Sequence, residues 1–245
     1  SPGDDTRQID WYAYARLDEL YLKLYMQEQD LALHLLVDQS ASMGAGEPPK
    51  LPYARKVSVA LASIALSAGD RVSVQILRGG DRSAGFGPRR GRSGLSRLLR
   101  FLADDGEARG QTALHEATTR FMQGRPAAGV VIVVSDLFDA GGYEESLKLL
   151  RYSGFEVHVV HVVSPDDVEP RVDQDLELVD AETGDVVTVA LNQAAIRDYR
   201  RAFDDFVDGA AQFCRRHGIG YVLARTDTPV EELILESLRR SGLVR

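Results

Sequence analysis

Three oxygen-bearing side chains near the start of the chain have the types and spacing of a cation site. The apolar run at residues 31–37 (LALHLLV) leads into Asp38-Gln39-Ser40-Ala41-Ser42, so a carboxylate and two hydroxyls alternate along the backbone. Such a run is typical of a buried parallel strand, and open α/β sheets bind ligands at the carboxyl ends of their strands. These oxygens are hard ligands that suit Mg²⁺ or Mn²⁺. Taken alone, such a triplet is more often only a loop that caps a helix.

Two later positions supply further oxygens. Thr112 precedes a predicted helix at residues 113–122, where its structural alternative is an N-cap. Asp136 follows a second apolar run, residues 129–135 (GVVIVVS), so the pattern of a buried strand that ends in a carboxylate recurs. In a doubly wound sheet these loops converge at one edge. We therefore predict a site for one Mg²⁺ or Mn²⁺, with one position open to a carboxylate of another protein; its ligands are Asp38, Ser40, Ser42, Thr112 and Asp136.

The elements that must position these side chains alternate between strands and helices. Further strands are expected at residues 71–77, 155–163 and 219–224, and helices at 53–68, 93–102, 113–122, 143–152 and 192–218, with a closing helix near Pro229. This alternation predicts an α/β fold, a doubly wound and mostly parallel sheet with helices on both faces. Residues 78–92 and 165–175 are expected to be irregular.

The domain organisation follows from the same patterns. Residues 1–30 contain a short helical pattern and a period-two pattern, and we expect an N-terminal extension packed on one domain that spans residues 31–245. That domain includes an inserted β-hairpin at about residues 176–191, with Gly184 in its turn.

The composition of the chain argues against several classes of function. A net charge of −8 argues against a general nucleic-acid binder. No apolar run approaches the roughly 20 residues that span a membrane, and the sequence does not begin with a signal peptide. The single Cys214 allows no internal disulfide and is expected to be buried in packing, which fits a cytoplasmic setting. A basic stretch is expected to be a solvated face; it contains Arg89, Arg90, Arg92, Arg97 and Arg100.

The order Asp-x-Ser-x-Ser, Thr, Asp resembles the metal-ion-dependent adhesion site of von Willebrand factor A domains. The likeness continues along nearly the whole chain, where several segments resemble a bacterial family catalogued as domain of unknown function 58. These segments are GDDTRQIDWYAYARLDELYLKLY, LLVDQSASM, GDRVSVQIL, GQTALHEA, VVSDLFD and LELVDAETGDVV. Members are commonly encoded beside MoxR-type AAA+ ATPases, and they usually carry sequence ahead of the GDD segment, some with membrane spans.

The resemblance implies binding rather than turnover. It implies a von Willebrand factor A-like fold in which the metal captures an acidic side chain of a partner protein. It also implies action with a MoxR-type ATPase in the assembly or maturation of protein complexes. The chain is expected to lack an N-terminal part, and it would be attached to a membrane if that part carries an anchor.

Two other functions stay open from the sequence. A metal-assisted hydrolase of phosphate esters would need a base near the metal, for which His115, Glu116 and Asp139 are the candidates. The sequence has no Gly-rich phosphate loop that ends in Gly-Lys-Ser or Gly-Lys-Thr. A metal-free α/β scaffold would instead use the basic stretch at residues 89–100 as its contact surface.

Overall fold

The computed structural model describes residues 31–77, 84–104, 106–170, 177–179, 186–188 and 193–240. The predicted extension at residues 1–30 lies outside these ranges and stays a prediction. None of the described helices is long and apolar enough to span a membrane.

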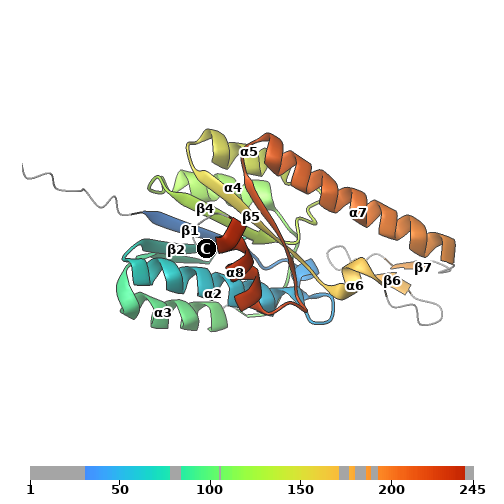
Figure 1. Ribbon diagram of the computed structural model, residues 1–245, viewed down its shortest axis with the longest axis horizontal. Helices are drawn as coiled ribbons and strands as arrows, with labels where there is room; N and C mark the ends of the chain where they lie inside the picture. Colours follow the sequence, from blue (N-terminus) through green and yellow to red (C-terminus); the bar gives the residue numbers. More distant parts are fainter. Residues whose placement is uncertain are drawn as a thin grey trace, which may run out of the picture. The chain divides into compact units, whose positions relative to one another are not determined.

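A sheet of six strands forms the centre of the described part of residues 31–245 (Figure 1). Its order is β3-β2-β1-β4-β5-β8. The strands are β1 (Ala32–Asp38), β2 (Arg71–Leu77), β3 (Gly85–Arg89), β4 (Val130–Ser135), β5 (Glu156–Val163) and β8 (Gly220–Arg225). Neighbouring strands are parallel except β3, which pairs antiparallel with β2 at the edge. The predicted mostly parallel sheet is thus confirmed.

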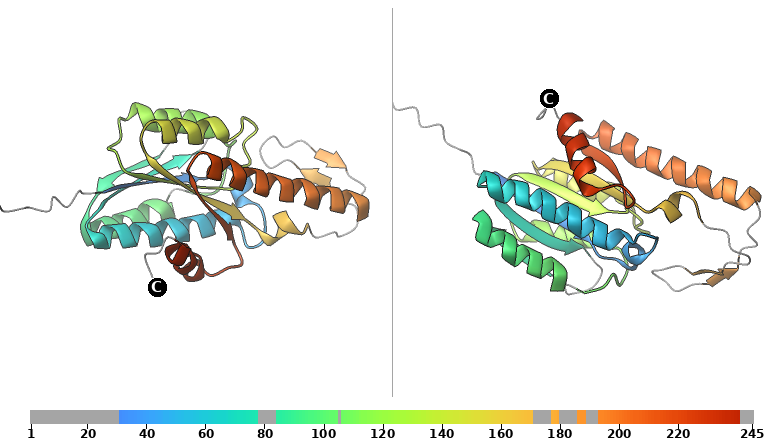
Figure 2. Two further views of the ribbon diagram at one scale, coloured as in Figure 1. Left: turned by 45° about the horizontal axis from the view of Figure 1, so that its top comes forward. Right: turned by 60° about the horizontal axis from the view of Figure 1, so that its bottom comes forward.

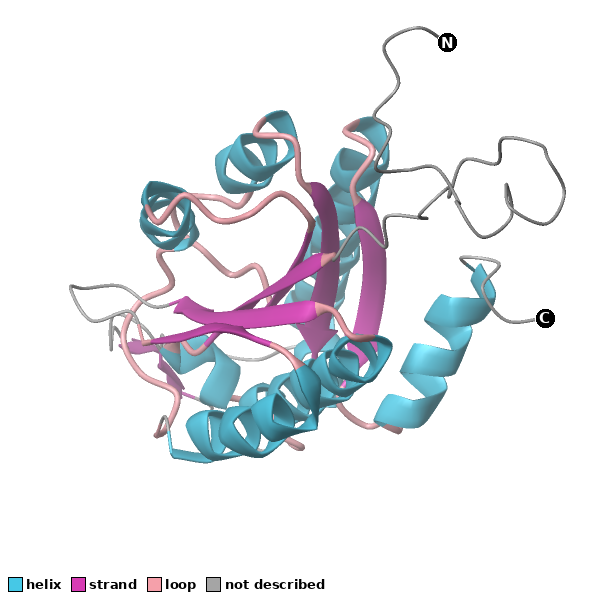
Figure 3. Cartoon of the chain, turned by 90° about the vertical axis from the view of Figure 1, so that its left-hand side faces the viewer, coloured by secondary structure: helices cyan, strands magenta, loops and turns pink. Residues whose placement is uncertain are grey.

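Helices cover both faces of this sheet (Figures 2 and 3). One face carries α2 (Lys50–Ala68), α3 (Gly91–Asp104) and α8 (Val230–Arg240), and the other carries α4 (Leu114–Gln123), α5 (Glu144–Tyr152) and α7 (Gln193–Arg216). Alternation along β1 divides its side chains between two apolar cores, with Leu35 and Val37 in the first and Leu36 in the second.

Cys214 is buried in the second core, as predicted, and burial raises the pKa of its thiol to about 11.

Four short elements complete the described chain. A 3-10 turn (Ala41–Gly44) follows β1, and α6 (Pro165–Val168) follows β5. Strands β6 (Glu177–Val179) and β7 (Val186–Thr188) pair antiparallel within the range of the predicted hairpin, whose expected turn with Gly184 lies outside the described residues.

The sheet has a topological switch point between β1 and β4. From β1 the chain moves to β2 and β3 on one side, and it later returns to β4 and continues to β5 and β8 on the other side. Loops at such a point leave toward opposite faces and open a crevice at the carboxyl ends of the strands. The predicted site residues Asp38 and Asp136 lie at the ends of these two central strands.

Three local expectations were wrong. Residues 85–89 form β3, because an exposed edge strand needs no apolar alternation and tolerates Pro88. Residues 165–168 form α6, because Ser164 and Asp167 make a capping box. Helix α2 begins at Lys50 rather than at residue 53, with Pro49 as its N-cap.

The basic stretch faces solvent where its side chains are described. Arg89, Arg90, Arg97 and Arg100 are exposed. This agrees with the expectation of a solvated face.

Candidate functional site

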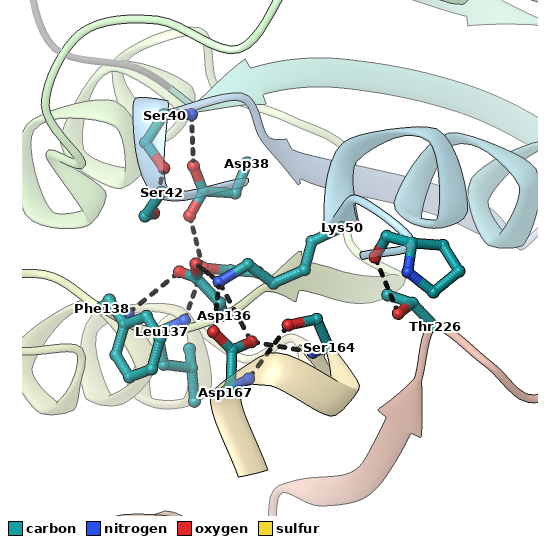
Figure 4. A network of polar contacts seen from close by, with 12 residues as sticks. Asp38, Ser40, Ser42, Lys50, Asp136, Leu137, Phe138, Ser164, Asp167 and Thr226 are labelled. Carbon is teal, nitrogen blue, oxygen red and sulfur yellow. Dashed lines mark hydrogen bonds and ion pairs between the residues drawn. The ribbon is translucent and has the colours of Figure 1, made fainter. Parts of the chain in front are cut away.

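The loop after β1 gathers the first three predicted oxygens. Asp38 Oδ1 accepts a hydrogen bond of 2.9 Å from the backbone N–H of Ser40. The hydroxyls of Ser40 and Ser42 lie 3.0 Å apart and are hydrogen-bonded to each other. Asp38 and Ser40 are fully buried, and Ser42 is 9% exposed. The alternation seen in the sequence therefore brings the three side chains into one cluster (Figure 4).

The end of β4 is connected to this cluster by Ser135. Its hydroxyl donates a hydrogen bond of 2.5 Å to Asp38 Oδ2 and accepts one of 2.9 Å from the N–H of Leu137. Asp136, the next residue, is fully buried, and its Oδ1 accepts a hydrogen bond of 3.1 Å from the N–H of Phe138. The predicted pair Asp38 and Asp136 is thus brought together at the switch point.

The loop that carries Thr112 is hydrogen-bonded to the loop after β1. Gly110 O accepts a hydrogen bond of 2.9 Å from Ala41 N, and Arg109 N donates one of 3.0 Å to Gln39 O. Thr112 lies two residues after Gly110 and is buried. It is not the N-cap of α4, because Ala113 holds that position and Asp139 Oδ2 accepts a 2.7 Å hydrogen bond from Leu114 N. Thr112 therefore precedes the N-cap position of this helix.

A buried lysine that the sequence did not point to completes the cluster. Lys50, the first residue of α2, is 1% exposed, and its Nζ lies 2.8 Å from Asp136 Oδ2. The same ammonium lies 3.3 Å from Asp167 Oδ2, on α6. Figure 4 shows Lys50 reaching between these two carboxylates.

The loop before Lys50 is fixed on both sides. Glu47 N donates a hydrogen bond of 2.8 Å to Asp166 Oδ2, and Pro48 O accepts one of 2.9 Å from Thr226 Oγ1. These contacts connect the segments after β5 and β8 to the start of α2. The position of Lys50 is therefore set by several parts of the fold.

The electrostatics of the site are dominated by buried acid. Burial raises the pKa of Asp38 to about 7, the Asp136 carboxylate adds to the rise, and hydrogen bonds from Ser135 and Ser40 oppose it. The Lys50 ammonium is ion-paired with Asp136 and Asp167, and Asp136 is in turn the charged neighbour of Asp38, so the cluster holds three acids and one ammonium. When all are ionised, this leaves an excess of two negative charges, which a divalent cation would balance.

His161 lies on β5 beside these acids and is fully buried. Its Nδ1 is hydrogen-bonded to Tyr221 OH at 2.7 Å. Burial lowers the pKa of His161 to about 4, although the Asp136 carboxylate acts in the opposite direction. The imidazole is therefore neutral near pH 7 and adds no positive charge to the site.

The donor set fits a hard divalent ion. The described residues contain no group of three His, Cys, Asp or Glu side chains that could hold a metal, so a cation here would depend on hydroxyl oxygens as well as carboxylates. Asp136 Oδ2 is buried and accepts no hydrogen bond from the part of the chain that the structure describes, although it is ion-paired with Lys50. A buried carboxylate oxygen held, among the described residues, only by Lys50, beside buried hydroxyls, is a set of donors that suits Mg²⁺ or Mn²⁺.

The candidate bases for a hydrolase are used elsewhere or face away. Glu116 is exposed on α4 and pairs with Arg120 at 3.5 Å. His115 is also exposed. Asp139 accepts hydrogen bonds from Leu114 N at 2.7 Å and from Gly141 N at 2.8 Å. The described geometry therefore favours none of the three as a base at this site.

Lys50 and Asp167 were missed by the sequence interpretation, although each had a local signal. Proline is favoured in the first turn of helices, so Pro49 and Pro52 could have placed the start of α2 at Lys50. Ser164 followed three residues later by Asp167 is a capping-box spacing. Neither signal indicates that the two side chains meet, because that contact depends on the tertiary fold.

The raised pKa of Asp38 makes the stability of the metal-free protein dependent on pH. An ordinary aspartate pKa of 3.8 rises to about 7 on folding, so between these values the folded state holds a proton that the unfolded state has lost. Stability should therefore fall as pH rises from about 4 to about 7, with a slope of up to about 1.4 kcal/mol per pH unit.

Urea unfolding of wild type and Asp38→Asn across this range, without metal, measures the effect. Because the lowered pKa of His161 contributes an opposite slope to both proteins, the difference between them isolates Asp38. A difference that stays constant between about pH 5 and about pH 7 would contradict the assignment.

Comparisons with known proteins find a family model and relatives that match most of this chain. A family model described as "Protein of unknown function DUF58" matches residues 1–206. The uncharacterized protein Rv1480 of Mycobacterium tuberculosis (strain ATCC 25618 / H37Rv) is 28% identical over 232 residues, which cover 92% of this chain and 72% of that protein.

Solved structures with a similar fold include the conserved hypothetical protein BatB from Bacteroides thetaiotaomicron. It has a TM-score of 0.51 and 20% identity over 86% of this chain and 98% of that chain. The SpRpn10 VWA domain has a TM-score of 0.48 and 8% identity over 84% of this chain and 94% of that chain. The predicted fold, a doubly wound and mostly parallel sheet covered by helices on both faces, is confirmed.

Proposed function

The chain belongs to the family described as "Protein of unknown function DUF58", and from this membership and the geometry of its site we propose that it is a metal-dependent protein-interaction module. Its ligands are the five residues of a metal-ion-dependent adhesion site, namely Asp38, Ser40, Ser42, Thr112 and Asp136. The observation that carries the proposal is the buried link Ser40–Asp38–Ser135, which brings the ends of β1 and β4 together at the switch point.

The two kinds of donor have different roles. The hydroxyls of Ser40, Ser42 and Thr112 would contact the ion, and Asp38 and Asp136 would supply negative charge, partly through water. Asp38 already accepts hydrogen bonds on both of its oxygens, which suits a residue that holds the loops in place around the ion. Bound Mg²⁺ or Mn²⁺ would supply a positive charge and an open position for a carboxylate of the partner.

The partner is proposed to be a protein that offers an acidic side chain, in the first instance a MoxR-type AAA+ ATPase. The family resemblance described above supports this choice. The module would act in the cytoplasm during the assembly or maturation of protein complexes, attached to a membrane where a preceding segment provides an anchor.

Replacing Thr112 with alanine tests the least obvious ligand. Loss of one hydroxyl ligand should weaken Mn²⁺ binding about tenfold, measured by isothermal titration calorimetry. Thr119→Ala, which removes the same group from the middle of α4, is the matched control and should bind like wild type. Equal affinities in all three proteins would remove Thr112 from the site.

A further inference from the structure

Lys50 has an environment that is unusual for a lysine. Its side chain is 1% exposed, whereas lysine is rarely fully buried without a partner. The Nζ atom lies 2.8 Å from Asp136 Oδ2 and 3.3 Å from Asp167 Oδ2, and it sits over the ring of Phe138 at 4.9 Å from the centroid (Figure 4). Two carboxylates and an aromatic face therefore surround one ammonium.

The local sequence does not favour a cation at this position. Lys50 is the first residue of α2, and the partial positive charge at a helix N-terminus disfavours a cation there. The ammonium is held instead by an acid from the loop after β4 and an acid from α6. Its position thus depends on the charge of Asp136, one of the five residues assigned to the metal.

We propose that Lys50 is a built-in counter-cation that sets the metal affinity of the site. In the metal-free protein its ammonium neutralises Asp136, and a divalent ion must compete with it for that carboxylate. This inference rests on the proposed function and extends it, because it names the residue that determines how tightly the metal is bound.

Asp167 gives the ammonium a second partner when the metal binds. Its Oδ2 accepts a hydrogen bond of 2.8 Å from Ser164 N within the capping box of α6, so it is fixed independently of Asp136. Lys50 already contacts this carboxylate. It can therefore release Asp136 and stay buried beside an acid.

The competition also couples the metal to the partner. A nearby ammonium lowers the affinity for a divalent cation by repulsion, and a carboxylate brought by the partner would offset this repulsion. The partner should then raise the metal affinity of the module, and by reciprocity the metal should raise the affinity for the partner.

Lys50→Met tests the proposal. Removal of one charge this close to the ion should tighten Mn²⁺ binding about tenfold or more, measured by calorimetric titration of the chelator-treated protein. The metal-free variant should also melt at a lower temperature than wild type, because Asp136 is left buried without its cation, and Mn²⁺ should raise its melting temperature by more than it does in wild type.

Two further variants serve as a charge control and as a second substitution of Lys50. Lys56→Met changes net charge equally at an exposed lysine of the same helix and should leave Mn²⁺ affinity unchanged. Lys50→Gln, which keeps a hydrogen-bond donor without the charge, should also bind Mn²⁺ more tightly than wild type. It serves if the methionine variant does not fold.

The outcomes separate this inference from the proposed function. If wild type binds Mn²⁺ and both Lys50 variants bind it equally or more weakly, the counter-cation role is overturned and the metal site stands. If only the variants bind Mn²⁺, the role is supported and metal dependence of the wild type is not. If no protein binds Mn²⁺, both the proposed function and this inference fail.

Discussion

Replacing Asp38 with alanine is expected to weaken Mn²⁺ binding by about a hundredfold or more. The substitution removes a negative charge from the proposed site and also the acceptor for Ser40 N and Ser135 Oγ. Loss of a residue that orients metal ligands typically costs ten- to a hundredfold in affinity, and here the lost charge adds to that cost. Calorimetric titration with Mn²⁺ measures the change.

The matched control is Asp70→Ala. Asp70 directly precedes β2, so it lies at the amino ends of the strands, away from the site at their carboxyl ends. Its substitution changes the net charge by the same amount as Asp38→Ala. A MoxR-type ATPase captured by the wild-type chain in Mg²⁺ should be lost with a chelator and with Asp38→Ala, and retained with Asp70→Ala. Capture that survives both the chelator and Asp38→Ala would favour the metal-free scaffold instead.

Asp136→Ala is expected to destabilise the metal-free protein by about 3 kcal/mol, because it removes the closer of two partners from a buried ammonium. Lys50 would keep Asp167 at 3.3 Å, which limits the cost. Urea unfolding near pH 7 without metal measures the loss.

The double variant Asp136→Ala/Lys50→Met provides the control for this pair. It removes both charges and should be clearly more stable than the sum of the two single losses predicts. Strictly additive losses would show that Lys50 and Asp136 do not interact in solution.

The central part of the fold could be predicted because its signals are local and strong. The buried strands β1 and β4 are continuous apolar runs, and β2 alternates between apolar and polar side chains with period two. Asp38, Ser40 and Asp136 follow directly from the ends of β1 and β4, where a doubly wound sheet binds its ligands. Those residues could therefore be named before any coordinates were known.

The rest depends on contacts between distant parts of the chain. Thr112 has the type and position expected of an N-cap, and only the tertiary fold shows that Ala113 holds that position and that Asp139 Oδ2 accepts a hydrogen bond from Leu114 N. The ion pairs of Lys50 with Asp136 and Asp167 span 86 and 117 positions of the sequence. No periodicity in the sequence indicates pairs that are so far apart. Strand β3 is exposed at the sheet edge and lacks the apolar pattern that identifies buried strands.

Anomalous X-ray diffraction from crystals soaked in Mn²⁺ tests the central claim most directly. The account predicts one strong peak within about 2.5 Å of the hydroxyl oxygens of Ser40, Ser42 and Thr112, with the carboxylates of Asp38 and Asp136 beside it. A peak elsewhere on the molecule, or no peak at this edge of the sheet while Lys50 still pairs with Asp136, would contradict it.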